Sequence, residues 1–333
     1  MRFARPQALS VHTFVLSYSP ISKMLSSFLH LALAASAVQA YTVIVVDHFM
    51  YKNIDPIVMP GKYKSHLHEF FGSDAVNVST TTSAELQQGC STAQNPNDFS
   101  VYWTPALLAD VGGKTVPVKP MRFSAYYIGI EAAEVPIPQN YKTIAGNASA
   151  TAQAQLNKLA GVQWFCEGDS APASKETAAF PTSTCSTHLQ NLLLFHDCVN
   201  VDTLESAYSG TQNWVNGYKA ANRCPPNMKR MPQLRFSIRY DLRKVLATGW
   251  SGTAPLKLAS GNSFSMHGDF INGWVPEAAQ NMLKANSKRD FAGVDGPLGK
   301  YNAGSICKDK AEDADPNHGT ADYATSVQMM RAA

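Results

Sequence analysis

Apolar and polar residues alternate along several short stretches of the chain, which is the pattern of β-strands with one buried face. The clearest alternation covers residues 234–243, where Phe236, Ile238 and Tyr240 share one face. Other strand-like stretches cover residues 41–46, 100–108, 121–130, 162–166, 192–198 and 256–259. Pro105 would place its stretch at a sheet edge or a bulge. Many short strands between Gly- and Pro-rich loops predict a mainly β protein, a single sandwich or jelly-roll-like domain with long loops.

Two stretches indicate short helices, over residues 151–160 and 276–284. Gly112-Gly113 lies between two strand-like stretches and predicts a hairpin turn. Towards the C-terminus the chain becomes polar and rich in Gly, Asp and Asn, so we expect a flexible tail over residues 311–333.

An apolar stretch near the N-terminus, residues 24–40, has the layout of a secretory signal peptide. Lys23 precedes it, its last residue Ala40 suits a signal peptidase, and it is too short to span a bilayer comfortably. We therefore predict an extracellular protein with no membrane segment, whose mature domain covers residues 41–310. Residues 1–23 are interpreted as an upstream extension outside the mature protein.

All six cysteines follow the predicted cleavage site. An even number in an oxidising compartment predicts three disulfides, and the sequence leaves all fifteen pairings open. Asn77 and Asn147 each begin an N-glycosylation motif, which is typical of a secreted glycoprotein.

The charge pattern argues against nucleic-acid binding. Charged residues make up 16% of the chain, below the roughly 25% of average soluble domains. The net charge is +3 and no basic stripe is visible, whereas a phosphate-binding surface needs clustered Lys and Arg. No feature indicates an obligate protein partner.

Histidines in two separate motifs provide the candidate chemistry. His66 and His68 follow a turn rich in Pro and Gly, and in an extended chain both imidazoles would point to one face. His267 and Asp269 flank Gly268, which would let the backbone turn sharply or approach a ligand closely. If the motifs converge, they present three imidazoles and one carboxylate.

Such a set is compatible with three interpretations. His66, His68 and His267 would suit a divalent metal ion such as zinc or copper as cofactor. Without a metal, a histidine oriented by Asp269 would act as a general base. In the third interpretation His267 and Asp269 only cap a turn. Either chemistry would suit cleavage of a polysaccharide, by hydrolysis or elimination. His48, His188 and His318 lie in no motif and receive no role.

Other mechanisms gain less support. Glycosidases usually place two carboxylates across a cleft, and no short motif brings any two of the candidates together: Asp55, Glu69, Asp197 and Asp269. The chain has no Gly-x-Ser-x-Gly, dinucleotide or phosphate-loop motif. Sugar-binding side chains are expected at Trp103, Trp274 and Tyr102, whose rings would stack on sugars, and at Arg239.

Five motifs in order carry a family resemblance: Asp55-Pro56-Ile57-Val58, Ser65-His66-Leu67-His68, Tyr102-Trp103-Thr104-Pro105, Cys224-Pro225-Pro226 and His267-Gly268-Asp269-Phe270. With them the chain resembles the secreted fungal and bacterial domain-of-unknown-function family nineteen-ninety-six. Members of that family are often found beside carbohydrate-binding modules of the WSC type. The resemblance implies a secreted, carbohydrate-related protein and supplies no reaction.

The chain departs from that family in one stretch. Where members often have Phe-Pro-x-Cys-Trp-Asp-Gly and a second histidine pair, this sequence has Phe195-His196-Asp197-Cys198 and no second pair. Any function of those residues is lost here or passes to His196 and Asp197. We predict a polysaccharide hydrolase or lyase with a His/Asp centre. The alternative is a non-catalytic wall-binding protein in which the same residues brace loops.

Overall fold

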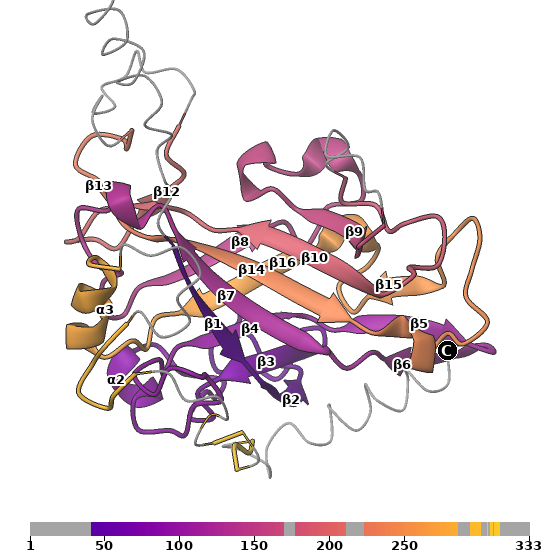
Figure 1. Ribbon diagram of the computed structural model, residues 1–333, viewed down its shortest axis with the longest axis horizontal. Coiled ribbons are helices and arrows are strands. Elements are labelled where there is room, and N and C mark those ends of the chain that lie inside the picture. The colour runs from indigo at the N-terminus through magenta and orange to yellow at the C-terminus, as the bar shows by residue number, and fades with distance from the viewer. Residues whose placement is uncertain are drawn as a thin grey trace, which may run out of the picture. The chain divides into compact units, whose positions relative to one another are not determined.

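Two antiparallel five-stranded sheets face each other in the computed structural model (Figure 1). The first sheet has the strand order β1 (Tyr41–Val46), β7 (Arg122–Ile128), β14 (Gln233–Tyr240), β10 (His188–Leu194) and β9 (Gln163–Glu167). The second has the order β2 (His48–Lys52), β3 (His68–Gly72), β4 (Val101–Pro105), β16 (His267–Ile271) and β8 (Lys142–Gly146). This arrangement confirms the predicted mainly β, sandwich-like fold.

The structure describes residues 41–169, 177–210, 223–285, 294–300, 305, 307–308 and 310–313. The predicted signal peptide, the upstream extension and most of the predicted tail lie outside these residues. Among the described residues, no helix has the length and apolar character needed to cross a membrane.

Smaller elements extend the sandwich. One three-stranded sheet contains β15 (Leu256–Leu258), β5 (Leu107–Val111) and β6 (Lys114–Pro117), and β5 and β6 form the predicted hairpin. Another contains β12 (Ser206–Ala207), β11 (Cys198–Val199) and β13 (Lys229–Arg230). The helices are α2 (Ser83–Leu86) and α3 (Pro276–Met282). Single 3₁₀ turns are η1 (Ile130–Ala132), η2 (Gln153–Gln155), η3 (Lys158–Ala160), η5 (Leu242–Lys244) and η6 (Ser263–Ser265).

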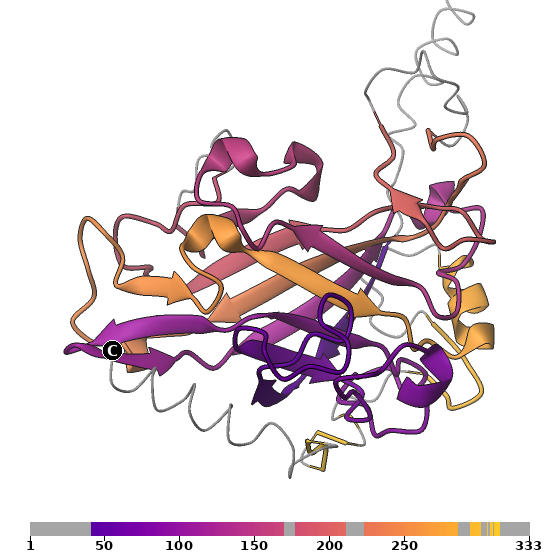
Figure 2. The same ribbon diagram turned by 180° about the vertical axis from the view of Figure 1, so that it is seen from behind.

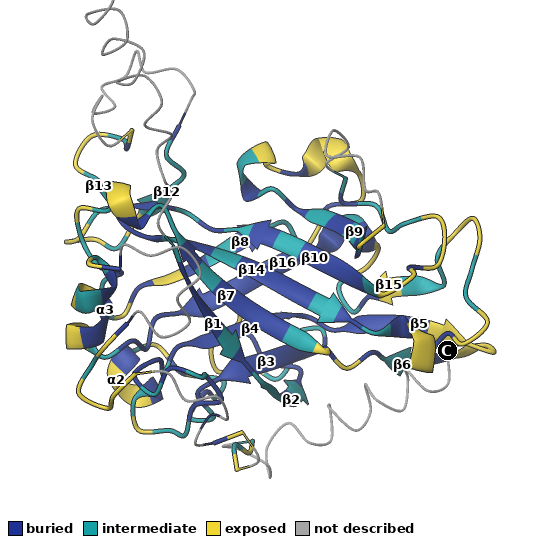
Figure 3. Ribbon diagram, in the orientation of Figure 1, coloured by how far each residue is buried: buried dark blue, intermediate teal, exposed yellow. Residues whose placement is uncertain are grey.

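Aromatic side chains fill the space between the sheets, and most strand residues are buried (Figure 3). Phe71 stacks on Phe123 of the facing sheet, with ring centroids 4.3 Å apart. Gly268 also faces this interior, where an added Cβ would lie 2.6 Å from the side chain of Leu193. The glycine between His267 and Asp269 is therefore required for packing between the sheets, rather than for the predicted approach to a ligand.

The outer face of the second sheet is covered as well. Phe70 and Trp103 stack on this face, with ring centroids 5.5 Å apart, and pack with buried Ile54 and Leu86. Ile54 belongs to the loop between β2 and β3, and Leu86 to α2, so these segments form the cover. Figure 2, which shows the molecule from behind, has the loop between β2 and β3 in front of the second sheet. The loop between β2 and β3, which we call the cover loop, is important because it carries His66.

Two local predictions were wrong. Residues 151–160 form η2 and η3 instead of one helix, because the Asn157 side chain accepts from the Leu159 N–H at 2.9 Å and caps a new turn. Pro105 ends β4, which lies in the centre of its sheet and pairs with β3 in regular register, instead of at the predicted edge or bulge. The chain tolerates this position because the ladder ends there and the next residue starts towards β5.

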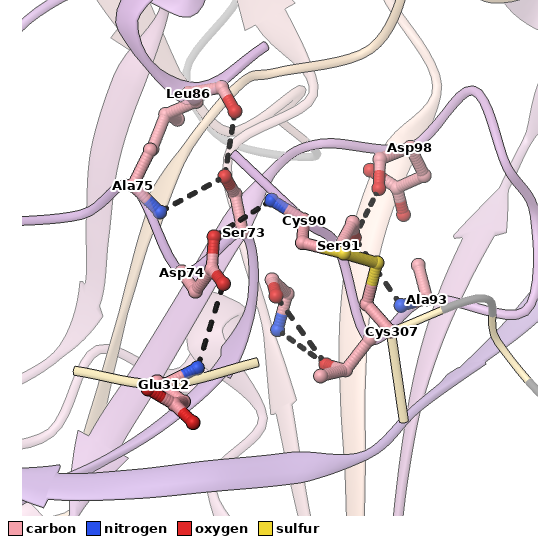
Figure 4. Close-up of a disulfide and its surroundings, with 12 residues drawn as sticks. Ser73, Asp74, Ala75, Leu86, Cys90, Ser91, Ala93, Asp98, Cys307 and Glu312 are labelled. Carbon is pink, nitrogen blue, oxygen red and sulfur yellow. Dashed lines mark hydrogen bonds between the residues drawn. A yellow bond between two sulfur atoms is a disulfide. The ribbon is translucent and has the colours of Figure 1, made fainter. Parts of the chain in front are cut away.

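Three disulfides are present, as predicted: Cys90–Cys307, Cys166–Cys185 and Cys198–Cys224. The first joins residues 217 positions apart and fastens the C-terminal segment to the loop after α2 (Figure 4). Beyond it, the Glu312 N–H donates to Asp74 at 3.4 Å. Asp313 binds the buried Lys52 ammonium at 2.5 Å. The first residues of the predicted flexible tail are therefore anchored.

Replacing Cys90 and Cys307 together by serine is expected to lower the free energy of unfolding by about 3 kcal/mol, because the cross-link restricts a long loop of the unfolded chain. Urea denaturation of the oxidised parent and the double variant measures this difference. A loss below about 1 kcal/mol would show that the cross-link contributes little to stability.

Candidate functional site

Three neighbouring strands of the second sheet bring the two histidine motifs together. In the register of β3 with β4, His68 pairs with Pro105, and in that of β16 with β4, Asp269 pairs with Trp103. Two residues before Asp269, His267 therefore lies level with Pro105 on the side opposite His68. Because side chains alternate, all of these residues point to the outer face. The compact Pro105 ring between the histidines leaves space for their imidazoles to converge.

His66 completes the cluster from the loop before β3. Its Nε2 lies 3.2 Å from Nε2 of His267, and Nε2 of His68 lies 3.5 Å from the same atom. One potential ligand atom from each imidazole lies within 4.8 Å of those of the other two. His68 and His267 are buried, whereas His66 is only partly buried, so His66 is the member of the cluster with the most contact with solvent.

Backbone carbonyls fix the tautomers of the two buried rings. Nδ1 of His68 lies 2.9 Å from the Ile54 carbonyl oxygen, and Nδ1 of His267 lies 2.8 Å from that of Ser265. A carbonyl only accepts, so each Nδ1 carries a proton and each Nε2 of a neutral ring presents its lone pair. Two lone pairs then face each other across 3.5 Å, an arrangement that a bound cation would stabilise.

Burial keeps the three imidazoles neutral. It lowers the pKa of His66 to about 3, where the charge of His267 adds to the effect, and that of His267 to about 4. Burial also lowers the pKa of His68 well below its ordinary value, and the charges of His66 and His267 lower it further. Neutral imidazole is the form that binds metal ions, so at neutral pH the cluster is ready to act as a ligand set.

Asp269 places a carboxylate beside the imidazoles. Its Oδ2 lies 3.9 Å from Nε2 of His267, and its side chain is 0% exposed. Neither carboxylate oxygen has a hydrogen-bond partner among the described residues. Burial raises the pKa of Asp269 well above its ordinary value, and the charge of Asp55 raises it further. A buried carboxylate without partners is costly unless a proton or a cation neutralises it.

Asp55 connects the loop to the site. Its Oδ1 accepts hydrogen bonds from the Ile57 N–H at 3.1 Å and the Val58 N–H at 2.9 Å. These bonds hold the turn that begins the cover loop, from which His66 extends. The charge of Asp55 adds to that of Asp269 and makes this buried region more favourable for a cation.

The nitrogen spacing agrees with a tetrahedral metal site. Zinc–nitrogen bonds of about 2.0–2.1 Å place neighbouring ligands of a tetrahedron roughly 3.3 Å apart. The two distances from Nε2 of His267 to the other imidazoles are 3.2 and 3.5 Å. Asp269, at 3.9 Å from this atom, would need a small side-chain movement or an intervening water molecule. Three nitrogen donors favour a first-row transition ion over magnesium or calcium.

The predicted sugar platforms are wrong for all three aromatic residues, because Trp103, Trp274 and Tyr102 are 0% exposed. The Tyr102 hydroxyl donates to Asp98 at 2.6 Å, and Trp274 Nε1 donates to the Tyr127 hydroxyl at 2.9 Å. These rings are parts of the packed interior, which a sugar cannot reach.

The other predicted residues lie outside the histidine cluster. Arg239 is on the first sheet, where its guanidinium binds Glu167 at 2.5 Å. His196 lies 2.8 Å from the Ser206 hydroxyl through Nδ1, and Asp197 binds Arg230 at 2.8 Å. His196 and Asp197, which could have replaced the missing second histidine pair of the family, therefore add no ligands to the cluster.

Glu69 follows His68 directly but points to the opposite face. Its Oε1 accepts from the Tyr240 hydroxyl at 2.5 Å and from the Thr104 hydroxyl at 3.1 Å, between the sheets. The carbonyls of Ile54 and Ser265 have no signal in the sequence, because any residue type would supply them equally well. Asp55, a candidate glycosidase carboxylate in the sequence, instead stabilises the loop that carries His66.

Comparison with protein families places these motifs in one known family. A family model described as a domain of unknown function (DUF1996) matches residues 55–274, a span that contains His66, His68, His267 and Asp269. Comparisons with curated proteins and with solved structures found no match. Since the match covers more than half of the chain, the protein belongs to the DUF1996 family.

Proposed function

We propose that His66, His68 and His267 bind a divalent transition-metal ion beside the carboxylate of Asp269, and that this centre acts on an extracellular polysaccharide. The observation that carries the proposal is the convergence of three neutral imidazoles, two of them with oriented Nε2 lone pairs, beside a buried carboxylate without hydrogen-bond partners. Between His68 and His267 no neutral form provides a proton at 3.5 Å, because each ring already holds its proton on Nδ1, and burial opposes a charge on either ring.

Hydrolysis is the reaction that this donor set supports best. An ion held by His66, His68 and His267 would leave a position for water and would supply the charge that makes water acidic enough to react at neutral pH. Asp269 would be the group that accepts the proton of this water, because its Oδ2 lies 3.9 Å from Nε2 of His267. The Ile54 and Ser265 carbonyls keep the rings oriented throughout.

Three features support an extracellular carbohydrate substrate. Residues 24–40 have the layout of a signal peptide, and three disulfides suit an oxidising compartment. The family resemblance points to carbohydrate. A segment of a polymer would approach the cluster from His66, the partly buried member of the three.

One observation favours a second candidate, a non-catalytic protein with a structural metal site. Asp269 is fully buried, and a carboxylate that binds the metal directly would close the site against water. The ion would then only fasten the cover loop to the sheet, and the protein would bind the wall without cleaving it.

Replacing Asp269 by asparagine is expected to separate these two candidates. If Asp269 accepts a proton, D269N keeps zinc and its polysaccharide-cleaving rate falls by roughly 100-fold or more. If Asp269 is a ligand in a closed site, D269N loses zinc affinity and the parent cleaves nothing.

The assay uses the zinc-loaded full chain on fungal and plant polysaccharides. New reducing ends report hydrolysis, and ultraviolet absorbance of unsaturated products reports elimination. The variant His188→Ala, outside the cluster, serves as the control. A zinc-loaded parent that cleaves no polysaccharide in the panel would contradict the enzymatic proposal.

A further inference from the structure

The residues that follow the Cys90–Cys307 disulfide are held to the rest of the chain (Figure 4). The N–H groups of Lys310 and Ala311 both donate to the Cys307 carbonyl oxygen, at 3.0 and 2.9 Å, so the chain turns directly after the disulfide. A backbone hydrogen bond and an ion pair hold the next two residues. We call residues 310–313 the strap. The strap is thus fastened both by the disulfide before it and by contacts of its own.

The ion pair joins the strap to the start of the cover loop. Lys52 is the last residue of β2 and immediately precedes the loop. Both carboxylate oxygens of Asp313 accept from the Lys52 ammonium, at 2.5 and 2.6 Å. The Lys52 side chain is only 2% exposed. Because a buried ammonium is costly without a carboxylate beside it, removing the charge of Asp313 would favour a turn of Lys52 towards solvent.

Lys52 also contacts the far end of the cover loop. Its ammonium lies 5.8 Å from the centroid of the Tyr63 ring, within the range of a cation–π interaction. Tyr63 packs against the apolar cluster on the outer face of the second sheet and lies three residues before His66. At the near end, Ile54 lies two residues after Lys52 and supplies the carbonyl that orients His68. Lys52 is therefore close to both ends of the loop, and each end contributes to the histidine cluster.

We propose that Asp313 is a positioning residue of the metal centre, which acts through Lys52 on the cover loop and so on His66. His66 depends on the loop most strongly, because His68 and His267 lie on strands. This role rests on the proposed function, since it presupposes a metal ion at the three histidines.

Limited digestion of the metal-free full chain with trypsin tests whether the strap holds the loop. Lys62 and Lys64 are exposed in the cover loop, and cleavage after them requires the loop to open locally. D313N should be cleaved there at least about fivefold faster than the parent. Cleavage after Lys114, exposed at the start of β6, should keep its rate and so exclude a general loss of folding. An unchanged rate after Lys62 and Lys64 would overturn the proposal.

Two further variants test whether the carboxylate of Asp313 is responsible. D313E keeps a carboxylate and should restore most of the resistance to trypsin. D295N removes the same charge from an exposed ion pair, in which Asp295 binds Lys300 at 3.1 Å, and should be digested like the parent. Digestion of D313E or D295N as fast as that of D313N would contradict a specific role of the Asp313 carboxylate.

Zinc titration of the same variants against a competing chelator tests the effect on the metal centre. D313N should bind zinc at least about tenfold more weakly than the parent, whereas D313E and D295N should match the parent. Faster digestion of D313N without weaker zinc binding would overturn its role in the metal centre. A parent that binds no zinc would contradict the proposed function and this role together, whereas a parent that binds zinc no more tightly than D313N would contradict this role alone.

Discussion

Replacing His267 by alanine is expected to weaken zinc binding by at least about 100-fold. Structural zinc sites bind with roughly 10–16 kcal/mol from four ligands, so one ligand accounts for about 3 kcal/mol. His267 is the central member of the cluster, because its Nε2 lies 3.2 Å from that of His66 and 3.5 Å from that of His68. Its loss therefore removes one donor and separates the other two. Titration against a competing chelator measures both affinities.

The matched control is His188→Ala. His188 is a partly buried histidine on β10 of the first sheet, where it binds Glu167. H188A tests whether the loss of a histidine outside the cluster also weakens zinc binding. If the parent, H188A and H267A bind zinc with the same affinity, the metal centre is contradicted.

The free energy of unfolding of the parent is expected to decrease at alkaline pH because of Glu69, and replacing Glu69 by glutamine should abolish this decrease. Burial raises the pKa of Glu69 to about 8, although hydrogen bonds from Tyr240 and Thr104 act in the opposite direction. The folded pKa lies above the unfolded one, so the folded state binds more protons between the two values. The stabilising contribution is complete below pH of about 4.5 and is lost as the pH rises through about 8.

Glutamine stays neutral and keeps an oxygen acceptor for Tyr240 and Thr104. The parent should lose on the order of 4 kcal/mol between pH 5 and pH 9 through this group, whereas E69Q should not. Urea denaturation at several pH values measures the slopes. Glu277→Gln, at an exposed position in the first turn of α3, is the matched control. Parallel stability curves for E69Q and the parent would contradict this account of Glu69.

Strands of the first sheet could be predicted because several of them, such as β14, alternate between buried and partly exposed residues, whereas β3, β4 and β16 of the second sheet are buried on both faces. Phe236, Ile238 and Tyr240 alternate with polar residues, and all three are buried against the second sheet. The rings of His66 and His68 lie together, with centroids 4.1 Å apart, although His66 belongs to the loop before β3 and not to an extended strand. Whether His267 converges with His66 and His68 could not be decided from the sequence, because no local pattern reveals that β4 lies between β3 and β16.

Other features depend on contacts that a local pattern does not contain. Trp103 and Trp274 lie in polar motifs, which suggested exposure, yet the cover loop and the facing sheet bury them completely. Gly268 looked like a turn residue, whereas its neighbours across the interior, Leu193 and Phe236, leave no space for a side chain. A hollow of about 190 Å³ beside His48 is lined by residues more than 250 positions apart, and no sequence motif predicts it.

X-ray absorption at the zinc edge of the zinc-loaded protein tests the metal centre most directly. We expect one zinc ion per chain, with three imidazole nitrogens at about 2.0–2.1 Å and at least one further oxygen ligand. Fewer than two imidazole ligands, or no stoichiometric zinc after loading at neutral pH, would contradict the assignment of His66, His68 and His267 as a metal site.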